Sequence, residues 1–478
     1  MRSPEHAKHS IIRSEAFTQD NIRQLLTEFL KTGEEMLLFL KSVLDIQVFE
    51  ITDNDKRKKL VSITTQNHNA IKAERQKLLA PLRQGPEYLF ALCRNQPNEL
   101  PAVSYRHRIE VETLETHTIS TWRVTSLMRA DRELFTLMQQ LKEQGEKTVP
   151  WAGAAALISR TSNIEQSPFV GRAYCFLPLP QETNLPLHIN GFFDLASSRR
   201  SLTSDFLTGR DQKRVQWNRL LVRHVLAQAY ANLIVSLVED LGETETEKFY
   251  SFFPTQQPPK ALSELPKAAI QLLQTKRVIR SAIQHSGVIR EKGQTRIGSS
   301  PWVTPKTISI LPQPWEQLLE PLRLEGIDLP DPVLPPDLVN AFTRSGAPLK
   351  TFKPGHLRSR LTTQEEIGVP LAEAPKACLR KPEWVIDLLR FSLSDGHKDL
   401  TGLPFAILED GTLQSFGYNP SSFIYLEDKI ERGILVEQIF ASHSDWFLDE
   451  DFRTGRNVHR RLQRSDSACR IRGRRPLT

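Results

Sequence analysis

The chain has 478 residues and a net charge of +7, with 39% hydrophobic and 25% charged residues. This length exceeds what one hydrophobic core usually serves, and the composition is that of a globular protein, which excludes collagen-like and disulfide-scaffold classes. Residues 453–478 hold nine arginines and one aspartate, so the first 452 residues carry a net charge of only −1. We therefore expect an electrostatically neutral folded part and an Arg-rich disordered tail, which could bind nucleic acid only non-specifically.

Neither a targeting segment nor a membrane span is expected. The N-terminal residues lack the apolar run of a signal peptide, and the apolar window 225–238 is interrupted by Gln228 and Asn232. The four cysteines are Cys93, Cys175, Cys378 and Cys469. Because they are scattered without metal-binding spacing, we expect a soluble, cytoplasmic protein with reduced thiols and no metal site.

The first half of the chain predicts an α+β domain over residues 1–253. Apolar residues at helical spacing predict a helix over 18–43, and alternation predicts a hairpin of strands 47–51 and 60–64. Further strands are predicted at 103–111 and 119–124, the first with Tyr105, His107, Ile109 and Val111 on one side.

Residues 171–194 read as two strand-like runs, RAYCFLPL and PLHINGFF, on either side of the turn PQETN. The broad apolar stripe of residues 212–241 then predicts a long helix that packs against a sheet. Strands followed by one long helix are typical of an α+β domain.

The second half predicts a connection and a smaller domain. Residues 254–345 read as a linker with a helix at 261–275, an irregular polar stretch at 285–307, and a short helix after the prolines of 329–342. Residues 346–450 predict a satellite domain, made of an amphipathic helix at 382–395 and a hairpin within 399–417.

Catalytic motifs are not found. The sequence contains no GxxxxGK[ST], GxGxxG after a strand, HExxH or GxSxG. His107, His188 and His224 are interpreted as packing or surface residues, and Cys175 as a small hydrophobic residue within a strand. Trp122, Trp151 and Trp217 are interpreted as core anchors.

The pair Arg199–Arg200 differs from these residues because it follows a strand and a bend. Two guanidinium groups on such a loop can bind a phosphate bidentately. The alternative is that both are solvated or pair with nearby acids such as Asp194 or Asp205. The sequence alone favours this alternative.

Four blocks of the chain together resemble the sacsin family. They are MLLFLKSVLDIQVFEI (36–51), GRAYCFLPLPQETNLPLHINGFFDLASSRRSL (171–202), WNRLLVRHVLAQAY (217–230) and WVIDLLRFSLSDGHKDLTGLPFAILEDGTLQSF (384–416). They follow one another as in one large sacsin repeat, over roughly residues 15 to 450. The resemblance implies the region after an Hsp90-like ATPase domain: an Hsp90-middle-like mixed sheet with a long packing helix, then a smaller, mostly helical domain with a hairpin.

The ATP-binding residues of that family are not matched here, so the resemblance implies a non-enzymatic chain with no cofactor of its own. ATP would act only through a separate upstream domain, whose phosphate Arg199 or Arg200 could contact by analogy. The implied function is that of a non-catalytic co-chaperone module. Its partners would be client proteins, other chaperones or other sacsin repeats.

Three alternatives to this function remain open. The chain could be a structural scaffold that spaces neighbouring domains, since its folded part is neutral and lacks polar constellations. It could be an ATPase with a divergent pocket, or it could bind nucleic acid through its tail, which predicts a steep dependence on salt.

Overall fold

A computed structural model describes residues 18–51, 56–165, 168–203, 210–291, 294–363, 367–396, 400–407 and 411–416. The chain divides into two compact units. Unit 1 comprises Met1–Val278 with Pro335–Pro348, and unit 2 comprises Ile279–Leu334 with Leu349–Thr478. The domain boundaries predicted at residues 253 and 345 stay predictions. The predicted Arg-rich disordered tail lies outside the described residues.

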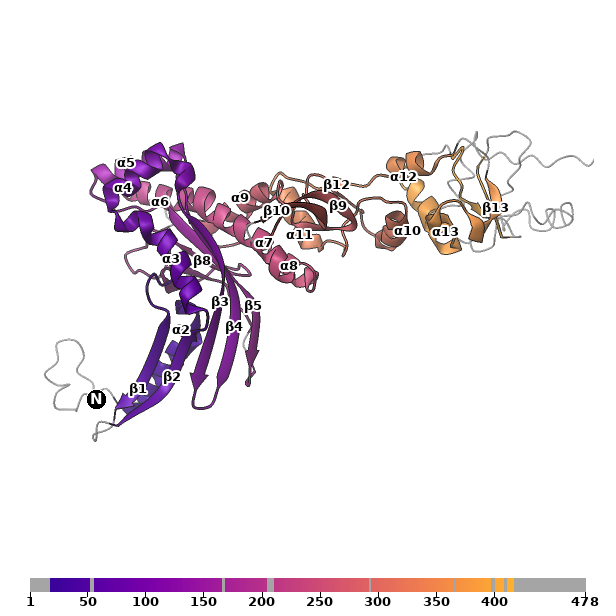
Figure 1. Cartoon of the computed structure of the whole chain (residues 1–478). Helices are drawn as coiled ribbons and strands as arrows, with labels where there is room; N and C mark the ends of the chain where they lie inside the picture. The colour runs from indigo at the N-terminus through magenta and orange to yellow at the C-terminus, as the bar shows by residue number, and fades with distance from the viewer. Residues whose placement is uncertain are drawn as a thin grey trace, which may run out of the picture. The chain divides into compact units, whose positions relative to one another are not determined.

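Unit 1 is built on an eight-stranded mixed sheet in the order β1-β2-β3-β4-β5-β8-β6-β7 (Figure 1). The strands are Asp45–Ile51 (β1), Arg57–Thr65 (β2), Ala102–Thr113 (β3), His117–Met128 (β4), Trp151–Ser162 (β5), Arg172–Cys175 (β6), Leu177–Glu182 (β7) and His188–Gly191 (β8). Neighbouring strands are antiparallel except β6 and β8, which are parallel. The hairpin and the two strands predicted between residues 47 and 124 are confirmed as β1 to β4.

The helices of unit 1 are Gln19–Met36 (α2), His68–Arg83 (α3), Pro86–Asn95 (α4), Arg132–Glu143 (α5), Arg210–Leu220 (α6), Ala227–Leu241 (α7), Thr246–Ser251 (α8), Leu265–Leu273 (α9) and Pro336–Arg344 (α11). A π-helical stretch, Leu221–Leu226 (η2), joins α6 to α7, so the predicted helix over 212–241 is confirmed as continuous. By length and composition this helix could cross a membrane, but 61% of its apolar window is buried inside the protein, as in the core helix of a globular unit.

The two faces of the sheet carry different helices. Tyr105, Ile109 and Val111 of β3 share one face, as predicted, and pack with apolar residues of α2. Arg106 of β3 lies on the opposite face and contacts Asp240 of α7. Because side chains alternate along a strand, α2 and α7 cover opposite faces.

The helix predicted over 18–43 ends earlier, at Met36. The guanidinium of Arg75, on α3, is buried and donates to the carbonyls of Leu37 at 2.5 Å and Val43 at 3.0 Å. A helix that reached residue 43 would have bonded the carbonyl of Leu37 internally, whereas here Arg75 satisfies it and the chain turns towards β1.

The single strand predicted over RAYCFLPL is also wrong, because Phe176 divides it. Phe176 has a φ of 65°, and its N–H donates to Oδ1 of Asn190 at 2.8 Å. The chain reverses there, and Cys175 of β6 faces Leu177 of β7.

Unit 2 begins with a hairpin where the sequence predicted an irregular stretch over 285–307. Ile279–Glu291 (β9) and Gln294–Val303 (β10) pair antiparallel, so that prediction is wrong. The later elements of unit 2 are Ser309–Ile310 (β11), Glu316–Leu318 (η4), Leu319–Leu324 (α10), Lys350–Thr351 (β12), Pro354–Leu361 (α12), Gly368–Pro370 (β13), Leu371–Glu373 (η5), Ala377–Leu379 (η6), Pro382–Ser392 (α13), Ala406–Ile407 (β14) and Thr412–Gln414 (β15). The predicted helix at 382–395 is confirmed as α13, and the predicted hairpin as the antiparallel pair of β14 and β15.

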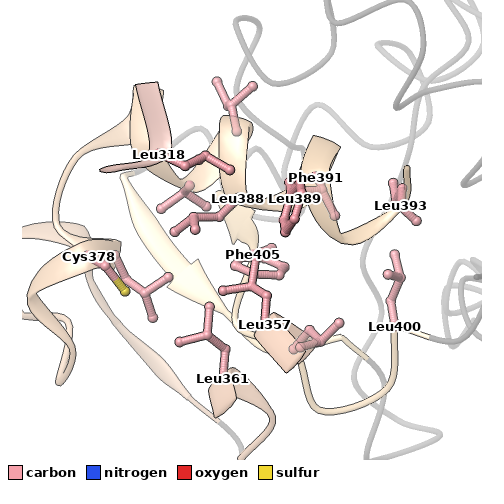
Figure 2. Packing of buried hydrophobic residues seen from close by; sticks show 14 of the residues in the cluster. Leu318, Leu357, Leu361, Cys378, Leu388, Leu389, Phe391, Leu393, Leu400 and Phe405 are labelled. Atoms are coloured by element: carbon pink, nitrogen blue, oxygen red, sulfur yellow. The ribbon is translucent and has the colours of Figure 1, made fainter. Parts of the chain in front are cut away.

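The core of this unit gathers around α13. Figure 2 shows Leu388 and Leu389 of α13 grouped with Leu357 of α12 and with Phe405, all fully buried. Cys378 lies in the same core, and burial raises the pKa of its thiol well above the ordinary value. It therefore packs as a small hydrophobic residue.

Candidate functional site

The predicted phosphate-contacting residues lie in a tight loop between β8 and α6. Leu195 and Leu202 form an antiparallel bridge at its base. Within the loop, the N–H of Arg199 donates to the carbonyl of Ala196 at 2.7 Å. Arg199 has a φ of 55°, which residues other than glycine seldom adopt, and Arg199 and Arg200 are both exposed.

The guanidinium groups of Arg199 and Arg200 form no ion pair within the part of the chain that the structure describes. Asp194 is one of the two acids that could have paired with them. It instead accepts a hydrogen bond from the hydroxyl of Thr203 at 3.0 Å and lies 3.7 Å from Nε of Arg214. The other acid, Asp205, lies outside the described residues. Two planar guanidinium groups therefore lie exposed on one loop. Each carries several N–H donors, and such a pair suits the binding of a phosphate or carboxylate.

Helix α6 holds both ends of this loop through Asn218. Its side-chain amide donates to the carbonyls of Asp194 at 2.8 Å and Thr203 at 3.1 Å, and its Oδ1 accepts from the N–H of Asp194 at 2.8 Å. Asn218 is only 2% exposed. The neighbouring Trp217 donates from Nε1 to the carbonyl of Phe192 at 2.8 Å. No local pattern in the sequence indicates this clamp on the loop.

Replacing Asn218 by alanine will therefore loosen the loop. Three backbone groups lose their partners in a buried setting, and we expect a cost of about 3 kcal/mol in the free energy of unfolding. Trypsin should then cleave after Arg199 or Arg200 much faster than in the native chain. Gln216→Ala is the control, because Gln216 is an exposed residue of the same helix. Equal cleavage of the two variants would show that Asn218 does not hold the loop.

A small, open hollow of about 40 Å³ lies beside the base of the loop. Its lining includes Glu146, Lys147, Asp194 and Arg214. Arg214 donates to Glu146 at 2.8 Å, so the charges of the hollow are largely balanced within the protein.

On the face that carries α2, a buried polar network surrounds His188. Nδ1 of His188 accepts from the N–H of Arg172 at 3.1 Å, so the proton of the neutral ring resides on Nε2, which lies 3.4 Å from Oε2 of Glu35. Tyr174 donates to the same oxygen at 3.2 Å, and Trp122 stacks on the imidazole ring. Burial alone would raise the pKa of Glu35, but His188, Tyr174 and Arg160 together hold it below its ordinary value. This network ties α2 to the sheet, a packing role for His188 as predicted.

The other residues considered for chemistry also have packing roles. Burial raises the pKa of the Cys175 thiol, which donates weakly to the carbonyl of Phe193 at 3.7 Å, and it raises that of Cys93 to about 11. Both thiols therefore stay protonated, which disfavours a nucleophilic role. The predicted core anchors Trp122, Trp151 and Trp217 are confirmed as buried. Among the residues that the structure describes, no three His, Cys, Asp or Glu side chains gather in a metal-binding group.

Comparison with known proteins gives one match. No protein-family model matches the chain, and no solved structure matches it. Sacsin of Homo sapiens is 30% identical over 259 residues, which are 52% of this chain and 6% of sacsin. The chain thus spans a small fraction of the length of this curated relative. Over about half of its length, this chain is a sacsin-like region.

Proposed function

We propose that this chain is a non-catalytic, cytoplasmic module of a sacsin-like, Hsp90-related co-chaperone, and that it holds client proteins during their folding. The observation that carries this proposal is the similarity to sacsin over half of the chain. The mixed sheet of unit 1 with its long packing helix accords with the Hsp90-middle-like architecture that the family resemblance implies.

The surface of unit 1 supports a client-holding role. Several large apolar side chains are exposed on it, namely Leu25, Phe49, Ile51, Leu114, Ile164 and Leu177. Single exposed apolar residues are ordinary, but a chaperone needs such residues in order to bind unfolded chains.

Suppression of aggregation tests the proposal. The purified chain is added at several-fold molar excess to heat-unfolded citrate synthase, and light scattering is followed without nucleotide. We expect scattering to fall in proportion to the added chain, while the same amount of serum albumin leaves it unchanged. Undiminished scattering at every ratio would favour a scaffold that only spaces its neighbours.

The exposed Arg199–Arg200 pair supports a second role, contact with the phosphate of ATP bound to a separate domain. We infer this role from the exposure of both guanidinium groups, which form no ion pair with any described residue, and from the family resemblance. The chain by itself should show no tight ATP binding in calorimetry. Mixed with an Hsp90-like ATPase domain of human sacsin, it should raise ATP turnover, and the double variant Arg199→Ala/Arg200→Ala should not. Tight ATP binding by the chain alone, weakened in that variant, would instead indicate a nucleotide pocket of its own.

A further inference from the structure

A larger open hollow, of about 300 Å³, lies on unit 2. Its lining comes from three segments of that unit: residues 307–309 at the start of β11, the segment that follows α10, and residues 352–360, which run into α12. Its polar side chains are those of Thr307, Ser309, Asp328, His356 and Arg360. Sites for small molecules begin at roughly this volume, about 300 Å³. The hollow is therefore large enough for a small metabolite.

The strand β11 contributes hydroxyl groups to this hollow. Thr307 and Ser309 both line it, whereas Ile308 between them is fully buried. Ser309 pairs with Lys350 in the parallel register of β11 and β12, so these two side chains share one face of the pair. Lys350 is exposed and forms no ion pair with any described residue. Two hydroxyls and an ammonium group thus lie on the same face.

Helix α12 contributes a guanidinium and an imidazole. Leu357 and Leu361 of this helix are buried in the core of unit 2 (Figure 2). Each is preceded by an exposed residue that lines the hollow, His356 and Arg360 respectively. The spacing of four residues keeps these two on one face of the helix. Arg360 also donates to the carbonyl of Glu325 at 3.0 Å, which orients its guanidinium group.

Most of the donors in this lining are left for a ligand. The imidazole of His356 and the hydroxyl of Ser309 form no hydrogen bond within the part of the chain that the structure describes. Arg360 forms no ion pair there. The lining also holds an acid, Asp328, whose Oδ1 accepts from the hydroxyl of Ser281 at 2.5 Å. The hollow therefore offers several donors and cationic groups together with one carboxylate.

These groups select the kind of ligand. A guanidinium, an imidazole and hydroxyls donate from several directions, which suits the tetrahedral oxygens of a phosphate. A carboxylate only accepts hydrogen bonds, so Asp328 repels a bare phosphate but suits hydroxyl groups attached beside one. Phe352 also lines the hollow, but it is only 6% exposed and offers little surface on which an aromatic ring could stack. The lining thus favours a hydroxylated carrier over an aromatic one.

We propose that this hollow binds a phosphate monoester of a small hydroxylated carrier, of the class of the sugar phosphates. Arg360, His356 and Ser309 bind the phosphate, and Asp328 accepts hydrogen bonds from the hydroxyls of the carrier. This site lies beyond the proposed client-holding function and does not depend on it.

Calorimetric titration of the full chain with glucose 6-phosphate tests this site. The variants are Arg360→Gln, Ser309→Ala and Asp328→Asn, and circular dichroism verifies that they fold. The control is Arg94→Gln, which removes an exposed cation from unit 1. Glucose, inorganic phosphate and phenyl phosphate serve as comparison ligands.

We expect saturable binding of glucose 6-phosphate, weaker binding of inorganic phosphate and none of glucose. Arg360→Gln should weaken binding of glucose 6-phosphate about tenfold and Ser309→Ala about threefold, while Arg94→Gln leaves it unchanged. Asp328→Asn should also weaken binding of glucose 6-phosphate about threefold, but it should strengthen binding of inorganic phosphate, because it removes a repelling charge.

Three outcomes would overturn the proposal. The first is the absence of saturable binding of glucose 6-phosphate. The second is an equal loss in Arg94→Gln and Arg360→Gln, since net charge alone would then attract the ligand. The third is tighter binding of phenyl phosphate than of glucose 6-phosphate, which would exclude a hydroxylated carrier. If Arg360→Gln does not fold, His356→Gln replaces it, and unchanged binding in that variant would count equally against the site.

Discussion

Replacing Asp240 by alanine will lower the free energy of unfolding of unit 1 by about 3–5 kcal/mol, because it leaves buried positive charge without its partner. The side chain of Asp240 is 0% exposed. Arg123, whose side chain is 10% exposed, donates to both of its oxygens, from Nε at 2.5 Å and from a terminal nitrogen at 2.6 Å. Arg106 contacts the same carboxylate. This cluster joins α7 to β3 and β4.

The adjacent acid provides a matched control. Glu239 lies 3.8 Å from Arg123, but its side chain is 59% exposed, so Glu239→Gln should change stability by less than about 0.5 kcal/mol. Urea unfolding gives the free energies, and hydrogen exchange of peptides from β3 and β4 locates the effect. Similar stabilities for the two variants would mean that the buried cluster does not hold α7 on the sheet.

Unit 1 will also lose stability as the pH falls below about 6.5, because His107 is buried in its neutral form. Burial, aided by the charge of Arg75, lowers the pKa of His107 to about 3. Thr65 donates its hydroxyl proton to the carbonyl of Leu44 at 2.6 Å, so Nε2 of His107 donates to Thr65 at 3.0 Å. Nδ1 is buried and has no hydrogen-bond partner among the described residues. A proton on this nitrogen would be neither solvated nor paired.

The direction of this effect follows from proton binding. The unfolded chain takes up a proton on His107 near pH 6.5 and the folded chain only near pH 3, so acid favours unfolding between these values, by roughly 1.4 kcal/mol per pH unit. The contribution of neutral His107 to the free energy of unfolding is fully present above pH 6.5 and is lost below about pH 3. Urea unfolding from pH 7 to pH 5 should show this slope in the native chain and not in His107→Gln. The exposed His117 serves as the control, since His117→Gln should retain the slope.

The sequence predicts elements with one buried and one solvated face. Alternation identified β3 and β4, and a broad apolar stripe identified the long helix. β5 was missed because residues 151–156 are all buried, so a strand in the middle of the sheet shows no alternation. The hairpin of β9 and β10 was missed because its glycines and serines interrupt any period.

At the candidate sites, features made by residues adjacent in the sequence could be predicted, whereas contacts between residues far apart in the sequence could not. The adjacency of Arg199 and Arg200 is evident from the sequence, and their place in a loop after a strand was predicted correctly. The clamp by Asn218 joins residues 24 positions apart, and the sequence contains no signal for such a contact. The place of β1 at one end of the strand order is likewise a property of the whole fold, which no local pattern in the sequence shows.

The most direct test of the client-holding function compares unfolded and native forms of one protein. Labelled citrate synthase, in either its heat-unfolded or its native form, is titrated with the chain without nucleotide, and fluorescence anisotropy measures binding. We expect saturable binding of the unfolded form and none of the native form. No binding of the unfolded form, or equal binding of both, would contradict the account.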